Sequence, residues 1–189
     1  MLYRCDGAFN CKDKSDEESC DVLMVEKGLY NKNYPPKRQG KPVVVKAYLN
    51  IRAIHNIKEI DMIFDAKFAI TLEWFDERLH FYNLKDGNFT NFAKPEKITK
   101  IWIPHLILNN TIKDIMISRD EPSVLSIKRM GKPTMSSHTE VHEDFYFRGD
   151  ENILLYRMNL ETTCSCIFNL RHYPFDKQTC EIQVAYCIN

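Results

Sequence analysis

The chain has 189 residues, of which 44% are hydrophobic and 12% aromatic, enough for one packed domain and a small appendage. Its 26 basic and 26 acidic side chains balance, which argues against a nucleic-acid footprint or a polybasic membrane patch. No apolar run approaches the roughly 18 residues that a membrane helix needs.

The cysteine count indicates the secretory route. Seven cysteines and two N-glycosylation sequons, at Asn88 and Asn109, are typical of secreted or cell-surface proteins. The first residues nevertheless lack a charged segment followed by an apolar one, so no secretory signal is visible. We therefore expect the sequence to be a fragment that lacks its true N-terminus and the part after Asn189.

Residues 1–20 are predicted to form a separate unit. From Cys5 to Cys20 the sequence follows the pattern CDGxxNCxDxSDExxC, which resembles the C-terminal half of a low-density-lipoprotein-receptor class A repeat. Such repeats depend on disulfides and one Ca²⁺ rather than on a hydrophobic core. The resemblance implies calcium ligation by the side chains of Asp6, Asn10, Asp16 and Glu17, and allows Cys5 to pair with Cys20.

Two departures limit that resemblance. Asn10 stands where the repeat usually has Asp, and only the last three of its six cysteines are present, so we expect Ca²⁺ binding only in a complete repeat. The alternative is an acidic, cysteine-containing tail.

Residues 21–42 are predicted to be a short helix and a linker. Asp21 is placed to cap a helix over Val22–Leu29, whose end Gly28 would loosen. Pro35 and Pro36 then exclude a helix and favour an extended path.

From Val43 onward, apolar and polar residues alternate with a period of two. This pattern predicts half-buried antiparallel strands, separated at Gly87, at Gly131-Lys132-Pro133 and at Gly149-Asp150. Strands without intervening helical patterns predict an all-β, antiparallel β-sandwich over residues 43–189. The predicted inward faces are Val43, Val45, Ala47, Leu49, Ile51 and Ala53; Phe64, Ala66, Phe68, Ile70, Leu72 and Trp74; Leu154, Tyr156, Met158, Leu160, Thr162, Cys164 and Cys166; and Ile182, Val184 and Tyr186.

The stretch from Cys166 to Cys180 reads CIFNLRHYPFDKQTC. Two cysteines at this spacing can close a 15-residue covalent loop, worth about 3 kcal/mol in the chain-entropy model. The order of Cys, alternating apolar residues, Tyr173-Pro174, a spacer, Asp176 and Cys resembles the signature loop of Cys-loop pentameric ligand-gated ion channels. The alternative is two unrelated cysteines around a turn.

Two further segments extend the resemblance along residues 30–186. Trp74-Phe75-Asp76-Glu77-Arg78-Leu79 is similar to the family's W-x-D-x-R-L motif. Trp102-Ile103-Pro104 with Asn110 is similar to its W-x-P-D-x-x-x-x-N segment, although His105 replaces the Asp. We expect Trp74 and Trp102 in the core rather than at a ligand.

The resemblance implies a mechanical function. Five such domains would form a ring at the extracellular side of the plasma membrane, with a small-molecule or ionic agonist between neighbours. The apolar tip of Tyr173, Pro174 and Phe175 would meet pore helices, and Asp176 would accept hydrogen bonds that hold the loop. The Tyr173–Pro174 bond is a candidate for the cis form.

The resemblance also places a ligand interface. Ala69 and Thr71 occupy positions where the family often has aromatic and arginine side chains, and both lie on the polar face of their strand. Arg157 lies on an outward face and is either a receptor for a carboxylate or a solvated surface arginine. Tyr186 adjoins Cys187, where an aromatic is usual. These departures argue against a conventional amine or amino-acid agonist.

Other groups of potentially metal-binding or catalytic residues give weaker evidence of a functional site. His138 and His142, with Glu140, Glu143 and Asp144, would gather Zn²⁺ or sense protons only on a helix, which this Ser/Thr-rich segment does not favour. Cys164 is predicted to be a buried thiol. No catalytic constellation stands out, so the sequence predicts no enzyme.

Three functional hypotheses remain. The first is the extracellular ligand-binding and gating domain of a neurotransmitter-type ligand-gated ion channel, with no cofactor in the sandwich. The second is a secreted soluble binding protein of the same fold without a pore, which would not need an apolar loop tip. The third is an adhesion module led by the acidic repeat.

Overall fold

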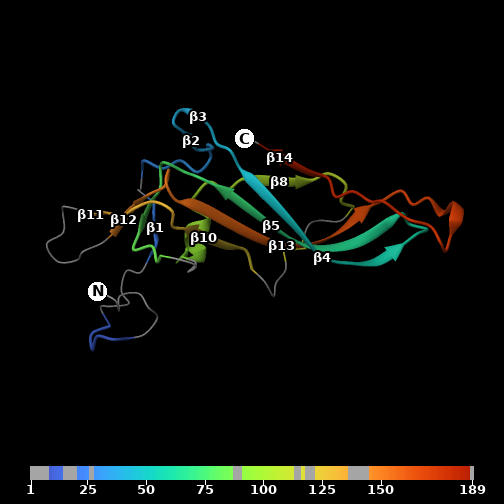
Figure 1. Cartoon of the computed structure of the whole chain (residues 1–189), viewed down its shortest axis with the longest axis horizontal. Coiled ribbons are helices and arrows are strands. Elements are labelled where there is room, and N and C mark those ends of the chain that lie inside the picture. The colour runs from blue at the N-terminus through green and yellow to red at the C-terminus, as the bar shows by residue number, and fades with distance from the viewer. Residues whose placement is uncertain are drawn as a thin grey trace.

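The computed structural model describes residues 9–14, 21–25, 28–86, 91–112, 116–117, 122–135 and 145–187. The protein is mostly β-structure in antiparallel sheets. Its largest sheet has the order β4 (Lys46–Lys58), β5 (Ile63–Trp74), β13 (Ile153–Ser165), β10 (Val124–Lys128) and β7 (Asn91–Phe92), and β9 (Met116–Ile117) also pairs with β13. Figure 1 shows β4, β5 and β13 running along the long axis of the molecule.

The inward faces of β5 and β13 form much of the core, as the alternation predicts. In β5, Phe68, Leu72 and Trp74 are almost fully buried, and each lies opposite a core-facing residue of β13 in register. Trp74 packs edge-on against buried Trp102, with ring centroids 6.2 Å apart, which confirms both indoles as core residues. Cys164 on the same face is a free thiol that is fully buried, and burial raises its pKa.

The predicted inward face of β4 is wrong, because Leu49 and Ile51 are 44% and 51% exposed rather than buried, and at the end of the strand the face itself changes. The register with β5 shifts between Ile51 and Ala53, so Ala53 lies opposite the outward-facing Lys67 instead of the core. A bulge adds one residue to a strand and therefore moves the following side chains to the other face.

Smaller sheets complete the fold. β1 (Leu23–Met24), β6 (His80–Tyr82), β12 (Phe145–Arg148) and β11 (Thr134–Met135) form one sheet in that order. β14 (Val184–Cys187) pairs with β8 (His105–Leu108), and β2 (Lys37–Arg38) with β3 (Lys41–Pro42). The described residues also include the short helix α1 (Pro95–Ile98) and a 3-10 turn at Leu170–His172.

The predicted helix over Val22–Leu29 is wrong where the structure describes it. Leu23 lies in β1 opposite Phe81 of β6, and both side chains are buried in the core. Long-range strand pairing and burial of Leu23 outweigh the local capping signal of Asp21, whose carboxylate instead pairs with Lys94 and Lys97.

The turn at Gly149 fixes how β12 meets the end of β5. Its amide donates to the carbonyl of Leu79 at 3.0 Å, and a Cβ at this position would lie 2.0 Å from the carbonyl oxygen of Asp76. Only glycine permits this approach of two backbones. In the stretches that the structure describes, no helix has the length and apolar character needed to cross a membrane.

Candidate ligand face and coupling end

The outward face of the long sheet carries a row formed by three strands. Thr71 of β5 lies directly opposite Tyr48 of β4 on one side and Arg157 of β13 on the other. Arg157 and Tyr48 are exposed, and Thr71 is partly so. We call Tyr48, Thr71 and Arg157 the ligand row, because it contains two of the positions that the sequence predicted for a ligand.

The other two predicted interface positions, Ala69 and Tyr186, are not part of the ligand row. Ala69 faces outward next to Thr71, but it lies between Asn50 and Asn159 and is only 4% exposed. Tyr186 belongs to β14, which pairs with β8 and not with the sheet of the ligand row. The structure therefore brings Thr71 and Arg157 together and leaves Tyr186 in another sheet.

Tyr48 is the residue that the sequence argument missed. Its hydroxyl donates to Glu73 Oε2 at 3.3 Å, and the negative charge of Glu73 raises the pKa of the Tyr48 phenol. The sequence signal that could have identified Tyr48 is an aromatic side chain on the polar face of an alternating strand, the face opposite to that of Leu49 and Ile51.

The loop from Cys166 to Cys180 lies at one end of the molecule and is closed by a disulfide between these residues, with Cα atoms 5.4 Å apart. Figure 1 shows it at the far right, beyond the turn between β4 and β5. The Gln178 side chain accepts from Asn169 N and donates to Asn169 O, both at 2.9 Å. Gln178 also donates to Asp176, so Asp176 contributes to the internal bonds of the loop.

The same end exposes apolar side chains from two segments. Ile167 and Phe175 of the loop are 91% and 93% exposed, and Ile60 of the β4–β5 turn is 96% exposed. The two segments are joined because Cys166 N donates to the carbonyl of Met62 at 2.9 Å. We call Ile60, Ile167, Tyr173 and Phe175 the coupling end. The Tyr173–Pro174 peptide bond is cis.

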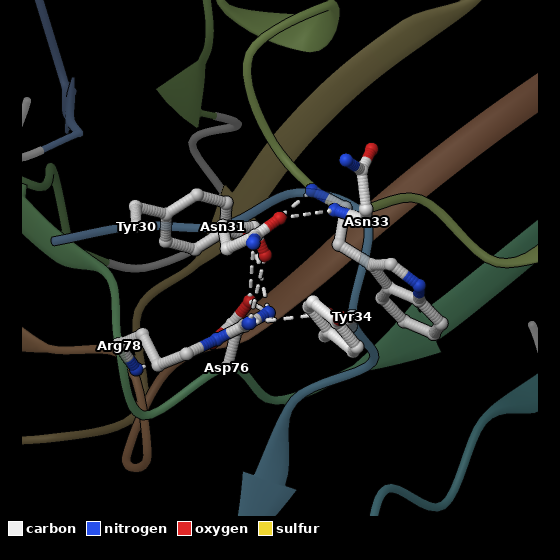
Figure 2. A network of polar contacts seen from close by, with 7 residues as sticks. Tyr30, Asn31, Asn33, Tyr34, Asp76 and Arg78 are labelled. Carbon is white, nitrogen blue, oxygen red and sulfur yellow. Dashed lines mark hydrogen bonds and ion pairs between the residues drawn. The ribbon is translucent and has the colours of Figure 1, made fainter. Parts of the chain in front are cut away.

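A buried ion pair fixes the chain at the end of β5. Asp76 is fully buried, and its carboxylate accepts from Arg78 Nε and Nη2, both at 2.8 Å. The Tyr30 hydroxyl donates to Asp76 Oδ2 at 2.8 Å and accepts from Trp102 N at 2.9 Å. Figure 2 shows Tyr30 and Arg78 beside Asp76, with their hydrogen bonds as dashed lines.

This network joins the W-x-D-x-R-L motif to the segment before the hairpin. Arg78 Nη1 donates to the carbonyls of Asn31 and Tyr34 at 3.1 and 3.0 Å. Burial, with the adjacent Asp76 carboxylate, raises the pKa of Tyr30 far above its usual value. Burial opposes the charge on Arg78, but its hydrogen bonds with Asp76 raise the pKa overall. The network is an ion pair with its hydrogen bonds that holds two chain segments together, and its described residues include none of the ligand row or the coupling end.

The two glycosylation predictions have different positions. Asn109 is exposed, whereas its neighbour Asn110 uses its side chain internally: it donates to Glu181 O at 2.7 Å and accepts from Gln183 N at 2.9 Å. Asn110 thereby ties β8 to the chain after Cys180. Asn88 lies outside the described residues.

Most predicted metal ligands also lie outside the described residues. This holds for the calcium ligands Asp6, Asp16 and Glu17 and for the histidine cluster at 138–144, and the predicted disulfide partners Cys5 and Cys20 lie outside them as well. Asn10 and Cys11 are described, and Cys11 is an exposed free thiol. Within the described stretches, no group of three His, Cys, Asp or Glu side chains is arranged to hold a metal ion.

Comparison with known proteins agrees with this architecture. The family described as the neurotransmitter-gated ion-channel ligand binding domain matches residues 17–187. The chain belongs to this family, which is a receptor domain and not an enzyme, as the sequence predicted.

Relatives are distant. The chain is 26% identical over 155 residues to the gamma-aminobutyric acid receptor subunit pi of Bos taurus, covering 82% of this chain and 30% of the relative. It is 24% identical over 178 residues to the gamma-aminobutyric acid receptor subunit theta of Mus musculus, which covers 93% of this chain and 24% of the relative. It is 25% identical over 145 residues to the glutamate-gated chloride channel of Drosophila melanogaster, which covers 76% of this chain and 27% of the relative. The chain thus spans less than a third of the length of these relatives.

Proposed function

We propose that this chain is the extracellular ligand-binding and gating domain of a membrane receptor channel, and that its ligand presents a carboxylate or similar anion to Arg157. The observation that carries the proposal is the ligand row, in which an exposed arginine lies beside Thr71 and across from Tyr48. A guanidinium and a hydroxyl on adjacent strands suit a planar anion, because Arg binds carboxylates with two parallel hydrogen bonds.

The names of relatives support an anionic group on the ligand. Two are named as receptors for gamma-aminobutyric acid and one as a channel gated by glutamate, and both compounds carry a carboxylate. The proposal for this chain concerns that carboxylate alone. It assigns no partner to the amine of such compounds, because the aromatic positions expected for it are Ala69 and Cys187 here.

The test is substitution of Arg157 in the whole receptor. We expect Arg157→Gln to raise the concentration of gamma-aminobutyrate or glutamate needed for half-maximal current by about tenfold or more, since a charge-assisted bidentate contact is lost. Arg157→Lys should restore part of the response. Lys128→Gln, on the outward face of β10 in the same sheet, serves as the matched control. An equal effect of Arg157→Gln and Lys128→Gln contradicts the proposal.

The wider assembly follows from the same proposal. The antiparallel sheets would be the two layers of a sandwich, five domains would form a ring, and the coupling end would meet pore helices at the plasma membrane. The exposed apolar side chains of Ile60 and Phe175 support a receptor with a pore over a secreted binding protein, which has no use for them. Expressing the full-length form and separating membrane from medium tests this choice, and recovery from the medium alone favours the secreted protein.

For residues 1–20 we propose a partial class A repeat that binds Ca²⁺ only when complete, through Asp6, Asn10, Asp16 and Glu17 with Cys5 paired to Cys20. Support comes from the acidic and cysteine spacing alone. Calorimetry with CaCl₂ on the longer native protein should give binding that Asp16→Asn abolishes. An adhesion function led by this unit would require calcium-dependent partner binding after deletion of residues 43–189.

A further inference from the structure

A groove of about 400 Å³ lies away from the coupling end, where the β2–β3 hairpin meets the beginning of β4 and the end of β5. Its walls combine charged and apolar side chains from segments far apart in the sequence. Arg38 and Lys41 come from the hairpin, Lys46 from β4 and Glu73 from β5. The remaining lining includes Val43, Val44, Phe75 and Ile153.

The hairpin places two like charges against each other. Arg38 and Lys41 are direct cross-strand partners, joined by the turn residues Gln39 and Gly40 with φ of 52° and 74°. Like charges directly opposite in an antiparallel pair destabilise it. Among the described residues, neither Lys41 nor Lys46 has a carboxylate as an ion-pair partner.

Arg38 is held in position rather than left to solvent. Its guanidinium carbon lies 3.8 Å from the centroid of the Phe75 ring, and Nη2 donates to the carbonyl of Asp150 at 3.2 Å. Neither contact neutralises the positive charge. Stacking on an aromatic ring restricts the side chain while leaving further guanidinium N–H groups as donors.

The acidic groups nearby are already in use. Glu73, the carboxylate that lines the groove, accepts from the Tyr48 hydroxyl at 3.3 Å. Glu77 accepts from Gln39 N at 3.2 Å. Three cations therefore face one lining carboxylate beside an apolar wall, which is the complement of a small anion with an apolar body.

We propose that this groove is a second binding site, for a small organic carboxylate whose charged end lies among Arg38, Lys41 and Lys46 and whose apolar end contacts Phe75 and Ile153. The site goes beyond the proposed function, since it shares no residue with the ligand row. It is adjacent to that row: the pair Lys46–Glu73 follows Tyr48–Thr71 on the same face, about 7 Å along the strands.

The probe is benzoate, titrated into the 189-residue chain and followed by calorimetry. We expect saturable binding that Lys41→Gln/Lys46→Gln weakens about tenfold, because two charged donors are removed. The control is Lys58→Gln, which removes an exposed positive charge from the same strand, β4, outside the groove. Both lysines of the double variant are exposed, and an unchanged near-ultraviolet circular dichroism spectrum checks that folding is retained.

Further arms separate this site from the ligand row. Benzamide, which is uncharged, should bind at least about fivefold more weakly than benzoate. In the Arg157→Gln background, which removes the arginine of the ligand row, benzoate should still bind saturably, and Lys41→Gln/Lys46→Gln should still weaken that binding about tenfold. Three outcomes overturn the groove as a site. These are loss of benzoate binding in Arg157→Gln, equal binding by the double variant and Lys58→Gln, and no saturable binding of benzoate. Binding of inorganic phosphate as tight as that of benzoate overturns the role of the apolar wall.

Discussion

At the scale of single residues, Asp76 and Arg78 carry the strongest constraint. Asp76 is fully buried and its partner guanidinium accounts for several of its hydrogen bonds. A buried ion pair adds little net stability over an apolar pair of the same volume, yet removal of one partner leaves an uncompensated charge. The pair Arg148–Asp150 has similar geometry at 2.8 Å, but the Arg148 side chain is 59% exposed, and solvent screening makes exposed pairs weak.

These two pairs give a matched prediction. Asp76→Asn should lower the free energy of unfolding by about 3 kcal/mol, because Arg78 keeps its charge in a partly buried place. Asp150→Asn should lower it by less than about 1 kcal/mol. Urea unfolding of both variants, followed by tryptophan fluorescence, measures the difference. Similar losses in the two variants would contradict the assigned role of Asp76.

Tyr30 gives a prediction about pH. Burial raises the pKa of its hydroxyl in the folded state, so the folded chain keeps this proton at a pH where the unfolded chain releases it. The resulting stability is fully present below about pH 10 and declines as the pH rises further, at up to about 1.4 kcal/mol per pH unit. Tyr30→Phe should be less stable at pH 8 but decline less steeply between pH 10 and 11. Parallel pH profiles for the two proteins would refute the assignment.

At the scale of elements, the sequence could predict what depends on alternation and not what depends on distant pairing. The period-two pattern places Phe68, Leu72 and Trp74 correctly, because burial of one face of β5 fixes its register. The local sequence predicts a helix at Leu23, because its strand partner Phe81 is 58 positions away and leaves no local signal. The bulge beyond Ile51 is likewise invisible in a strand whose apolar pattern continues through it.

The candidate site divides in the same way. Thr71 and Arg157 could be placed on polar faces of separate strands, but their pairing, and the addition of Tyr48, required the register of three strands. The charge crowding of the groove depends on the β2–β3 hairpin, which the sequence showed only as a Pro-rich linker. Gln39 and Gly40 form its turn with positive φ, and Gln is a weak signal for that conformation.

The covalent loop is an element whose contribution can be measured. Cys166 and Cys180 are separated by 14 positions, and closing a loop of about this size restricts the unfolded chain by about 3 kcal/mol. Cys166→Ala/Cys180→Ala should lower the free energy of unfolding by about that amount and leave the long sheet intact. Guanidinium unfolding with and without a reducing agent provides the measurement. If reduction destabilises the double variant as much as the parent, another bond is responsible.

At the scale of the whole molecule, the three strands that carry the ligand row also lead to the coupling end, because Ile60 lies in the β4–β5 turn and Phe175 in the loop after β13. β4, β5 and β13 carry Tyr48, Thr71 and Arg157, and β5 pairs with β13 in register over twelve consecutive residue pairs. A continuous hydrogen-bonded ladder of this length moves as one body more readily than it bends. A displacement at the ligand row would therefore reach the turn at Ile60 and the loop at Phe175.

This arrangement predicts that the coupling end affects opening and not binding. In the whole receptor, Phe175→Ser should reduce the maximal current several-fold, because the apolar side chain that would meet the pore helices in the proposed assembly is removed, a loss of about 2 kcal/mol. Radioligand affinity should change little, since Phe175 is 93% exposed and its loop is held by Gln178 and the disulfide rather than by its own packing. Asn169→Ala, which disturbs the loop without altering its apolar tip, is the comparison. Reduced affinity with normal maximal current for Phe175→Ser would place this side chain in ligand binding instead of coupling.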